Sequence, residues 1–144
     1  APMGMLADEL ARRGVAVTLA QGAPTASRLL ARELFESVCR RTAYATDDGT
    51  AGACGFVTTL TPELIAVDRP DVIYACGPEP MLAAVARIAG EQGIDCQVSM
   101  ERRMACGIGL CYSCVAKIRQ ADGGWDYQRT CIHGPVFDAS KILW

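Results

Sequence analysis

The chain has 144 residues, of which 51% are hydrophobic and 21% are charged. It can therefore bury the core of one globular domain with a small appendage, and it is not a disordered chain. Fourteen basic residues against sixteen acidic ones leave a net charge of −2, which excludes the basic surface that nucleic acid binding demands. The chain opens without a signal-peptide pattern and has no window near the roughly 18 apolar residues of a membrane span. We expect a cytoplasmic protein that binds neither nucleic acid nor a membrane.

Residues 1–98 alternate between helical and strand-like stretches. Apolar residues recur at helical spacing in four stretches, residues 3–13, 24–41, 58–66 and 79–90. Each is followed by a short apolar run typical of a buried strand, at residues 15–20, 42–46, 71–76 and 94–100. In the second helix Ser27 is the predicted N-cap, and the predicted apolar face consists of Leu30, Leu34, Phe35 and Val38. Apolar strands that alternate with helices are typical of a parallel sheet covered on both faces, so we expect an α/β lobe.

The pattern changes at about residue 99, where glycine, cysteine and charged residues replace the helical stripes. Two β-like runs, at residues 115–120 and 125–130, flank the turn Asp122-Gly123-Gly124 and predict a β-hairpin. This stretch has almost no periodic pattern of core residues, and so short a segment seldom folds by burial alone. We therefore expect it to need a cross-link, such as a metal site or disulfides. The predicted organisation is a parallel-sheet lobe over residues 1–98 and a small β-rich domain over residues 99–144.

The cysteines predict a metal site in this second domain. Four of the eight follow the pattern Cys-x4-Cys-x2-Cys-x16-Cys, at Cys106, Cys111, Cys114 and Cys131. Three ligands in one loop with a distant fourth is the plant-type spacing of a [2Fe–2S] cluster. Zinc, with His133 as a possible ligand, and disulfides are the alternatives, although zinc sites favour two short ligand pairs and disulfide frameworks belong to small secreted chains. Buried hydrophobic packing is the expectation for Cys39, Cys54, Cys76 and Cys96.

Glycines and arginines surround the cysteine loop. Gly107 and Gly109 would let the backbone adopt positive φ and approach a cluster closely, as wrapping around it requires. Arg102 and Arg103 precede the loop and would either steer a partner and offset the cluster's negative charge or simply lie on a solvated face.

Two loops follow predicted strands at the place where parallel sheets bind ligands. Cys76, Gly77 and Pro78 form one of them, and a Gly-Pro turn leaves backbone open to a flat ring. The other contains Asp47, Asp48 and Gly49, which would suit the edge of a cofactor, while a solvated turn explains them equally well.

Four stretches carry a resemblance to a known family. "VSMERRMACGIGLCYSCV" and "RTCIHGPVFDASKILW" resemble the cluster domain of the electron-transfer subunit of NAD-dependent dihydroorotate dehydrogenase, in the ferredoxin-NAD(P) reductase superfamily. "ATDDGTAGACGFVT" and "YACGPEPML" resemble the nucleotide-binding lobe of the same subunit. Subunits of sulfhydrogenases and anaerobic sulfite reductases share the cluster loop and the Cys-Gly-Pro turn, whereas the stretch from Thr46 to Gly49 favours the dihydroorotate enzyme.

The resemblance implies an oxidoreductase component that passes electrons between an FMN-containing dihydroorotate dehydrogenase subunit and NAD, through a [2Fe–2S] cluster and FAD. It implies that Cys76, Gly77 and Pro78 lie where nicotinamide meets flavin, and that Gly22 lies near the adenosine ribose. In that family a flavin-binding barrel and a glycine-rich loop precede the residues that match Ala1 and Pro2. We therefore expect a partial NAD-binding lobe that holds FAD poorly and does not turn over alone. A zinc-stapled interaction module is the alternative from another functional class.

Overall fold

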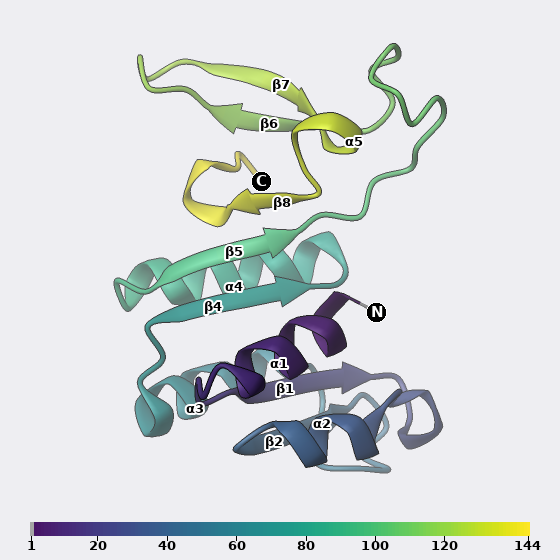
Figure 1. The fold of residues 1–144 in the computed structure, drawn as a ribbon, viewed down its shortest axis with the longest axis vertical. Coiled ribbons are helices and arrows are strands. Elements are labelled where there is room, and N and C mark those ends of the chain that lie inside the picture. The colour runs from purple at the N-terminus through teal and green to yellow at the C-terminus, as the bar shows by residue number, and fades with distance from the viewer. Residues whose placement is uncertain (1) are drawn as a thin grey trace. The chain divides into compact units, whose positions relative to one another are not determined.

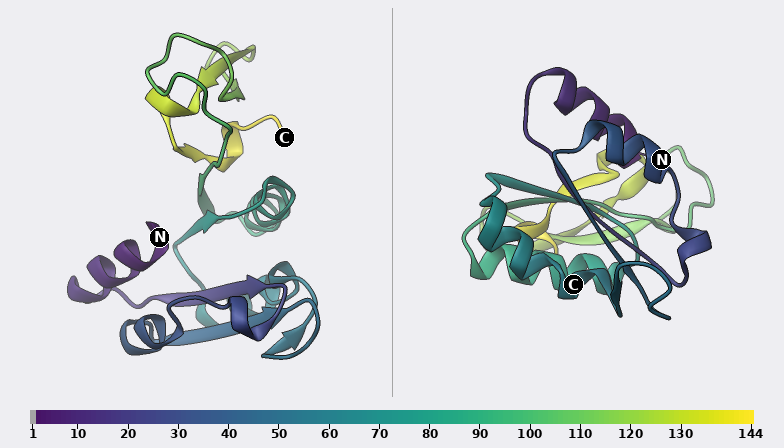
Figure 2. Two further views of the ribbon diagram at one scale, coloured as in Figure 1. Left: turned by 90° about the vertical axis from the view of Figure 1, so that its right-hand side faces the viewer. Right: turned by 90° about the horizontal axis from the view of Figure 1, so that it is seen from below.

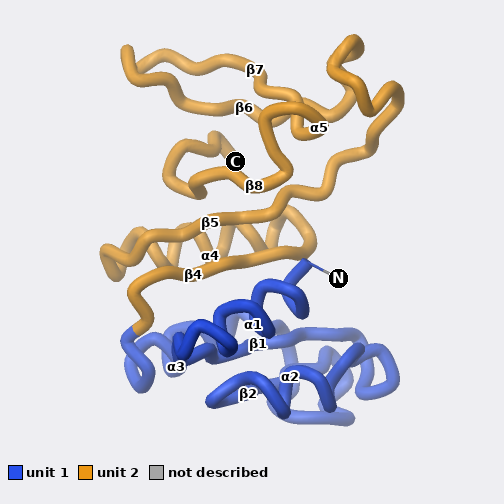
Figure 3. The backbone as a smooth tube through the Cα atoms, in the orientation of Figure 1, with its two compact units in different colours: residues 1–69 blue, residues 70–144 orange. Residues whose placement is uncertain are grey.

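The structure is a computed structural model that describes residues 2–144 (Figure 1). The chain divides into two compact units, one up to residue 69 and one over residues 70–144 (Figure 3). Across the described residues, no helix has the length and apolar character needed to cross a bilayer.

The first unit is built on a three-stranded parallel sheet in the order β1-β2-β3. Its elements are α1 (Pro2–Arg12), β1 (Thr18–Ala23), α2 (Arg32–Val38), β2 (Arg41–Thr46), β3 (Ala53–Cys54) and α3 (Thr61–Asp68), with short 3-10 turns at Ala26–Arg28 and Val57–Thr59. α1 and α2 lie side by side on one face of the sheet, and α3 lies on the other (Figure 2). This part of the chain is the predicted α/β arrangement with both faces covered.

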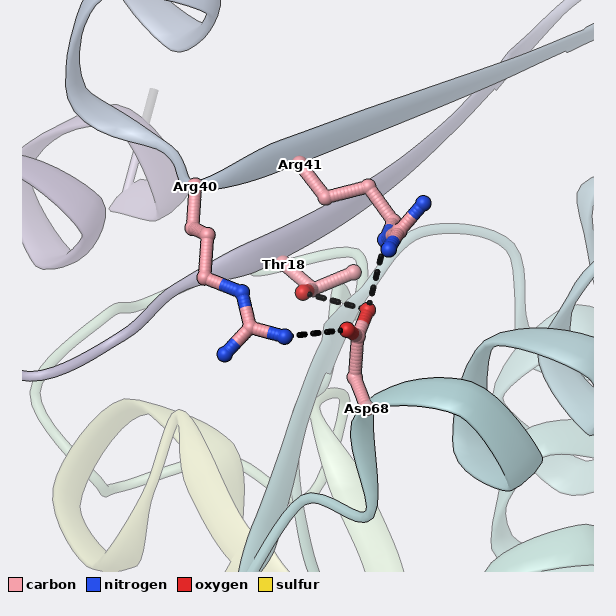
Figure 4. A network of polar contacts seen from close by, with 4 residues as sticks. All are labelled: Thr18, Arg40, Arg41 and Asp68. Carbon is pink, nitrogen blue, oxygen red and sulfur yellow. Dashed lines mark hydrogen bonds and ion pairs between the residues drawn. The ribbon is translucent and has the colours of Figure 1, made fainter.

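A buried carboxylate ties three elements of the first unit together (Figure 4). Asp68, at the end of α3, accepts a hydrogen bond of 2.9 Å from the hydroxyl of Thr18 on β1. Its two oxygens also pair with Arg40, which directly precedes β2, and with Arg41, the first residue of β2, over 2.8 and 3.0 Å. The hydroxyl of Thr18 and then the charges of Arg41 and Arg40 lower the pKa of Asp68, although only 7% of its side chain is exposed. The network fixes α3 against β1 and β2.

The first strand begins three residues later than the sequence predicts. Gly14 ends α1 at a φ of +75°, and the N–H groups of Gly14 and Val15 donate to the carbonyls of Ala11 and Leu10 over 2.9 and 3.0 Å. This closure uses residues 13–15 to terminate the helix, in the manner of a glycine C-cap. The strand expected at residues 15–20 therefore starts at Thr18.

The second helix also begins later than predicted. Ser27 is not its N-cap, because Ser27 lies in a separate 3-10 turn and α2 starts only after Ala31, which has a left-handed φ of 55°. The later start changes which residues face the core. Phe35 is buried as predicted, whereas Leu30 and Leu34 are 71% and 43% exposed, and Val38 is only partly buried.

The second unit contains a three-stranded sheet and a separate hairpin. Its elements are β4 (Val72–Cys76), α4 (Glu79–Glu91), β5 (Asp95–Ser99), β6 (Val115–Arg119), β7 (Trp125–Arg129), α5 (Thr130–His133) and β8 (Val136–Asp138). β4 and β5 are parallel, β8 joins β5 in antiparallel pairing, and α4 lies along one face of β4 and β5 (Figures 1 and 2). β6 and β7 form the predicted hairpin, with Val115 opposite Arg129 and Arg119 opposite Trp125.

Residues after 99 share one hydrophobic core with β4, α4 and β5. Met100, Ile118, Phe137 and Ile142 are buried in the same cluster as Leu82 of α4. The strand β8, which the sequence did not predict, places Phe137 opposite Val98 of β5. The compact units divide between residues 69 and 70, and the domain boundary between residues 98 and 99 stays a prediction.

Candidate metal centre

All four cysteines of the predicted metal set lie in the second unit as free thiols. Cys106, Cys111 and Cys114 lie on the loop between β5 and β6, and Cys131 lies on α5. The N–H of Thr130, the residue before Cys131, donates to the carbonyl of Cys114 over 2.8 Å. This backbone contact brings the third and fourth cysteines together although they are far apart in the sequence.

The four thiols are arranged as two pairs. In the first pair, the N–H of Cys111 donates to Sγ of Cys106 over 3.4 Å, and the N–H groups of Cys111 and Ile108 lower the pKa of Cys106 to about 6. In the second pair, the N–H of Cys131 and then its thiol lower the pKa of Cys114. Burial and then the Cys114 thiol raise the pKa of Cys131, and so does charge on Cys106. The two pairs therefore lie within electrostatic reach of one another.

This arrangement fits a two-iron group better than a single metal ion. A zinc site needs its ligands around one centre, whereas these four thiols lie as two pairs. In a [2Fe–2S] cluster held by four thiolates, bridging sulfides complete the coordination of each iron, so the protein supplies two ligands per iron. Thiols in two adjacent pairs, with N–H groups directed at sulfur, are a suitable donor set.

The glycines of the loop have the backbone conformation that the sequence predicts. Gly107 and Gly109 have φ values of +68° and +81°. Gly109 is buried against α5, where a Cβ would lie 2.9 Å from Cδ1 of Ile132. The stretch between the first two cysteines is thus packed against the helix that carries the fourth.

Arg129, the last residue of β7, contacts this loop and has no motif of its own in the sequence. Its Nη1 donates to the carbonyl of Gly109 over 2.6 Å, and its guanidinium carbon lies 5.1 Å from the centre of the Tyr112 ring. Its backbone N–H donates to Nδ1 of His133 over 3.1 Å. His133 therefore supports the backbone that leads into α5. No pattern could reveal Arg129, because its hydrogen-bond partner is a main-chain carbonyl 20 residues away.

An ion pair anchors the segment that enters the cysteine loop to the turn after β4. Arg102 binds Glu79 through two hydrogen bonds, Nη1 to Oε2 at 2.8 Å and Nη2 to Oε1 at 2.9 Å. Glu79 is the first residue of α4 and directly follows Cys76, Gly77 and Pro78. Only 29% of the Arg102 side chain is exposed, so this arginine is structural rather than part of a solvated face.

Gly22 and Asp47, two of the predicted cofactor residues, lie at the carboxyl ends of β1 and β2 in the first unit. The N–H of Asp47 donates to the carbonyl of Ala23 over 3.1 Å, which places Asp47 beside the end of β1. Gly22 lies on β1, and a Cβ there would lie 2.8 Å from Cβ of Val57. Close packing is therefore one reason for a glycine at position 22.

Asp48 and Gly49 form a tight turn in the same loop. The carboxylate of Asp48 accepts hydrogen bonds from the N–H and the hydroxyl of Thr50, over 3.0 and 2.6 Å. The hydroxyl of Thr50 is the main cause that lowers the pKa of Asp48. Asp48 thus stabilises the turn through its own side chain, and a cofactor contact at Asp48 or Gly49 stays a prediction.

The remaining cysteines differ in their burial. Cys96 lies in the core, and burial raises its pKa to about 11. Cys39 and Cys76 are partly buried, while Cys54 is exposed. The expectation of a buried thiol is confirmed for Cys96 and is wrong for Cys54, because the two-residue strand β3 lies at the edge of its sheet.

Comparison with known proteins identifies the segment that holds these thiols. Residues 101–143 match the family model of the iron-sulfur cluster binding domain of dihydroorotate dehydrogenase B. Two relatives are named as electron transfer subunits of dihydroorotate dehydrogenase B (NAD(+)). The protein of Fusobacterium nucleatum is 38% identical over 98% of this chain and 52% of its own length. That of Listeria welshimeri is 42% identical over 98% of this chain and 53% of its own length.

A solved structure has a similar fold. The NADH-dependent reduced ferredoxin-NADP oxidoreductase, described for its flavin-based electron bifurcation, matches 99% of this chain and 49% of its own chain. The TM-score is 0.81 and the sequence identity is 27%, which confirms the predicted fold class of a parallel α/β lobe followed by a small β-rich part. The chain spans about half the length of the curated relatives it matches. Over nearly all of its own length the chain is similar to electron transfer subunits of dihydroorotate dehydrogenase B, and residues 101–143 match the iron-sulfur cluster binding domain of that enzyme.

Proposed function

We propose that this chain carries single electrons through a [2Fe–2S] cluster held by Cys106, Cys111, Cys114 and Cys131. The proposal rests on the arrangement of these four thiols as two neighbouring pairs inside the segment that matches the cluster-binding family. A cluster of this kind accepts and releases one electron at a time. The task of the chain itself is to hold the thiolates and to set the charge and hydrogen bonding around them.

The loop backbone suits negatively charged ligands. The N–H groups of Cys111 and Ile108 act on the sulfur of Cys106, and the N–H of Cys131 acts on the sulfur of Cys114. Such N–H groups stabilise charge on sulfur, and hydrogen bonds to sulfur are one determinant of a cluster's potential. We propose that these backbone N–H groups help to retain the cluster and set part of its reduction potential.

We place the other end of the electron path at Cys76, Gly77 and Pro78. This turn follows β4 at the carboxyl end of a parallel strand, where α/β sheets bind ligands, and the pair between Arg102 and Glu79 ties it to the cysteine loop. In the intact subunit FAD and NAD would meet at this turn. Further contacts with the cofactors are proposed for Gly22, Asp47, Asp48 and Gly49.

For the intact protein we propose transfer of electrons from an FMN-containing dihydroorotate dehydrogenase partner to NAD. The names of the relatives support this choice over a sulfhydrogenase or a sulfite reductase. The partner that co-purifies with the intact subunit distinguishes these enzymes. Only a dihydroorotate dehydrogenase partner has a flavin that dihydroorotate reduces. A cytoplasmic location is proposed with it, because eight free cysteines suit a reducing compartment.

Metal analysis of anaerobically purified protein tests the cluster. We expect a brown protein with about two irons and about two acid-labile sulfides per chain, and a paramagnetic signal on one-electron reduction. A colourless protein with about one zinc would refute the proposal in favour of a zinc-stapled module.

A matched pair of cysteine variants locates the cluster. Cys111→Ser should abolish the visible absorbance and the bound iron, because it removes one of the four ligands. Cys54→Ser changes an exposed thiol of the first unit and should leave both unchanged. Equal behaviour of the two variants would contradict the assignment of the ligands.

A further inference from the structure

The side chain of Arg129 contacts both stretches of the loop that separate the predicted cluster ligands. Between the first and second cysteines, its Nη1 donates to the carbonyl of Gly109 over 2.6 Å. Between the second and third, its guanidinium lies over the ring of Tyr112 at 5.1 Å. Arg129 itself ends β7, one residue before α5 brings in Cys131. One side chain therefore joins the three segments that supply all four ligands.

The chemistry of arginine suits this position. Its planar guanidinium can donate hydrogen bonds in its plane and stack on an aromatic ring at the same time, which a lysine ammonium cannot do. The bond to Gly109 is short, as is typical of hydrogen bonds from a charged donor. Both contacts hold the backbone of the loop, so their loss would free the two turns that carry the thiols.

The charge of Arg129 is also partly withdrawn from water. The side chain is partly buried, and within residues 2–144 its Nε is buried without a hydrogen-bond partner. A buried N–H group of a cation is costly unless negative charge lies nearby. Four thiolates that hold a cluster would supply that charge.

We infer that Arg129 is a positioning residue for the cluster. Its side chain holds the cysteine loop in the shape that binds the cluster, and its charge raises the reduction potential of the bound cluster. The inference rests on the proposed function. In the one-electron reduction by an added reductant such as dithionite, the cluster gains one negative charge, and a nearby guanidinium stabilises the reduced form more than the oxidised form. Contacts that support metal ligands typically contribute 10- to 100-fold to metal retention.

Two substitutions of Arg129, both studied in the chain that carries the cluster, separate its effect on the shape of the cysteine loop from the effect of its charge. In Arg129→Gln we expect a lower midpoint potential in a titration followed by electron paramagnetic resonance, and roughly 10- to 100-fold faster bleaching by a chelator. Arg129→Lys keeps the charge but loses the planar contact with Tyr112. It should therefore bleach faster than the unsubstituted chain, while its potential stays closer to the unsubstituted value than that of Arg129→Gln.

The matched control is Arg119→Gln, at the opposite end of the same hairpin. Arg119 is exposed on β6 opposite Trp125, so the substitution changes the net charge equally and should leave potential and bleaching unchanged. Equal effects at positions 119 and 129, or no effect at position 129, would overturn the inference. If Arg129→Gln does not fold, the bleaching rates of Tyr112→Leu and Arg129→Lys test the inference instead. Unchanged bleaching in both of these variants would also overturn the inference. A chain that binds no iron before any substitution would instead reject the proposed function.

Discussion

The backbone at position 52 has no room for a side chain. Gly52 has a φ of +68°, and a Cβ there would lie 2.0 Å from the carbonyl oxygen of Tyr44 on β2. From this point the chain runs parallel to β2, because the next residue, Ala53, pairs with Ala45 to form β3. The glycine is therefore required by the third strand of the sheet, independently of any ligand at the loop.

Gly52→Ala should destabilise the first unit by more than the ~1–2 kcal/mol that left-handed backbone alone costs an alanine. The excess comes from the clash with the carbonyl of Tyr44. Gly14→Ala is the control, because Gly14 has a similar φ of +75°, whereas a Cβ there would point into open space among the described residues. Urea unfolding of both variants measures the difference, and equal losses of stability would show that the clash relaxes without cost.

Elements with a signal inside their own sequence are predictable, whereas those that depend on distant partners are not. α4, over Glu79–Glu91, and the hairpin of β6 and β7 agree with the patterns that predict them. β8 has only three residues, too few for a periodic pattern, and it exists through its pairing with β5. The same limit applies at the metal centre: cysteine spacing reveals the ligands, but Arg129 acts through the main chain and Glu79 through an ion pair across the fold.

The contact of α3 with β1 and β2 should make the stability of the first unit sensitive to acid. The hydroxyl of Thr18 and the charges of Arg41 and Arg40 lower the pKa of Asp68, relative to an ordinary value of about 3.9 in the unfolded chain. The network therefore contributes fully above that ordinary value, and its contribution is lost as the pH falls through the lowered pKa. Asp68→Asn should lower the urea midpoint at neutral pH and lessen its fall on acidification.

Asp8→Asn is the matched control for this acid effect. The carboxylate of Asp8 is 44% exposed and pairs with Arg12 over 3.1 Å, one turn along α1. Exposed pairs of this kind contribute only about 0–1 kcal/mol, so this variant should keep the midpoint and the acid profile of the unsubstituted chain. The same acid profile in Asp68→Asn as in Asp8→Asn would mean that the network does not govern the acid response.

The predicted ligands all lie in one of the two compact units, so the cluster should not stabilise the whole molecule evenly. The sequence predicts that the segment after residue 99 needs a cross-link. In the structure this segment buries Phe137 and Ile142 in a core with Leu82 and Val98. That core contains none of the four predicted ligands. The loop over residues 101–114 is different, because it forms neither helix nor strand and exposes Ile108 and Leu110 at 68% and 78%. The metal should therefore stabilise the loop and α5 far more than β8.

Removal of the cluster with a chelator under reducing conditions should therefore unfold the second unit only in part. Amide hydrogen exchange should rise most over residues 101–114 and 130–133, because cluster binding and the folding of its ligand segments are linked. Exchange over β1 and β2, which carry none of the predicted ligands, should not change, and the amides of Val98 and Phe137 should stay protected by their shared core. The Cys111→Ser variant provides the same comparison without a chelator and should give the same map of exchange. A uniform loss of protection along the chain would contradict this division, and so would an unchanged loop.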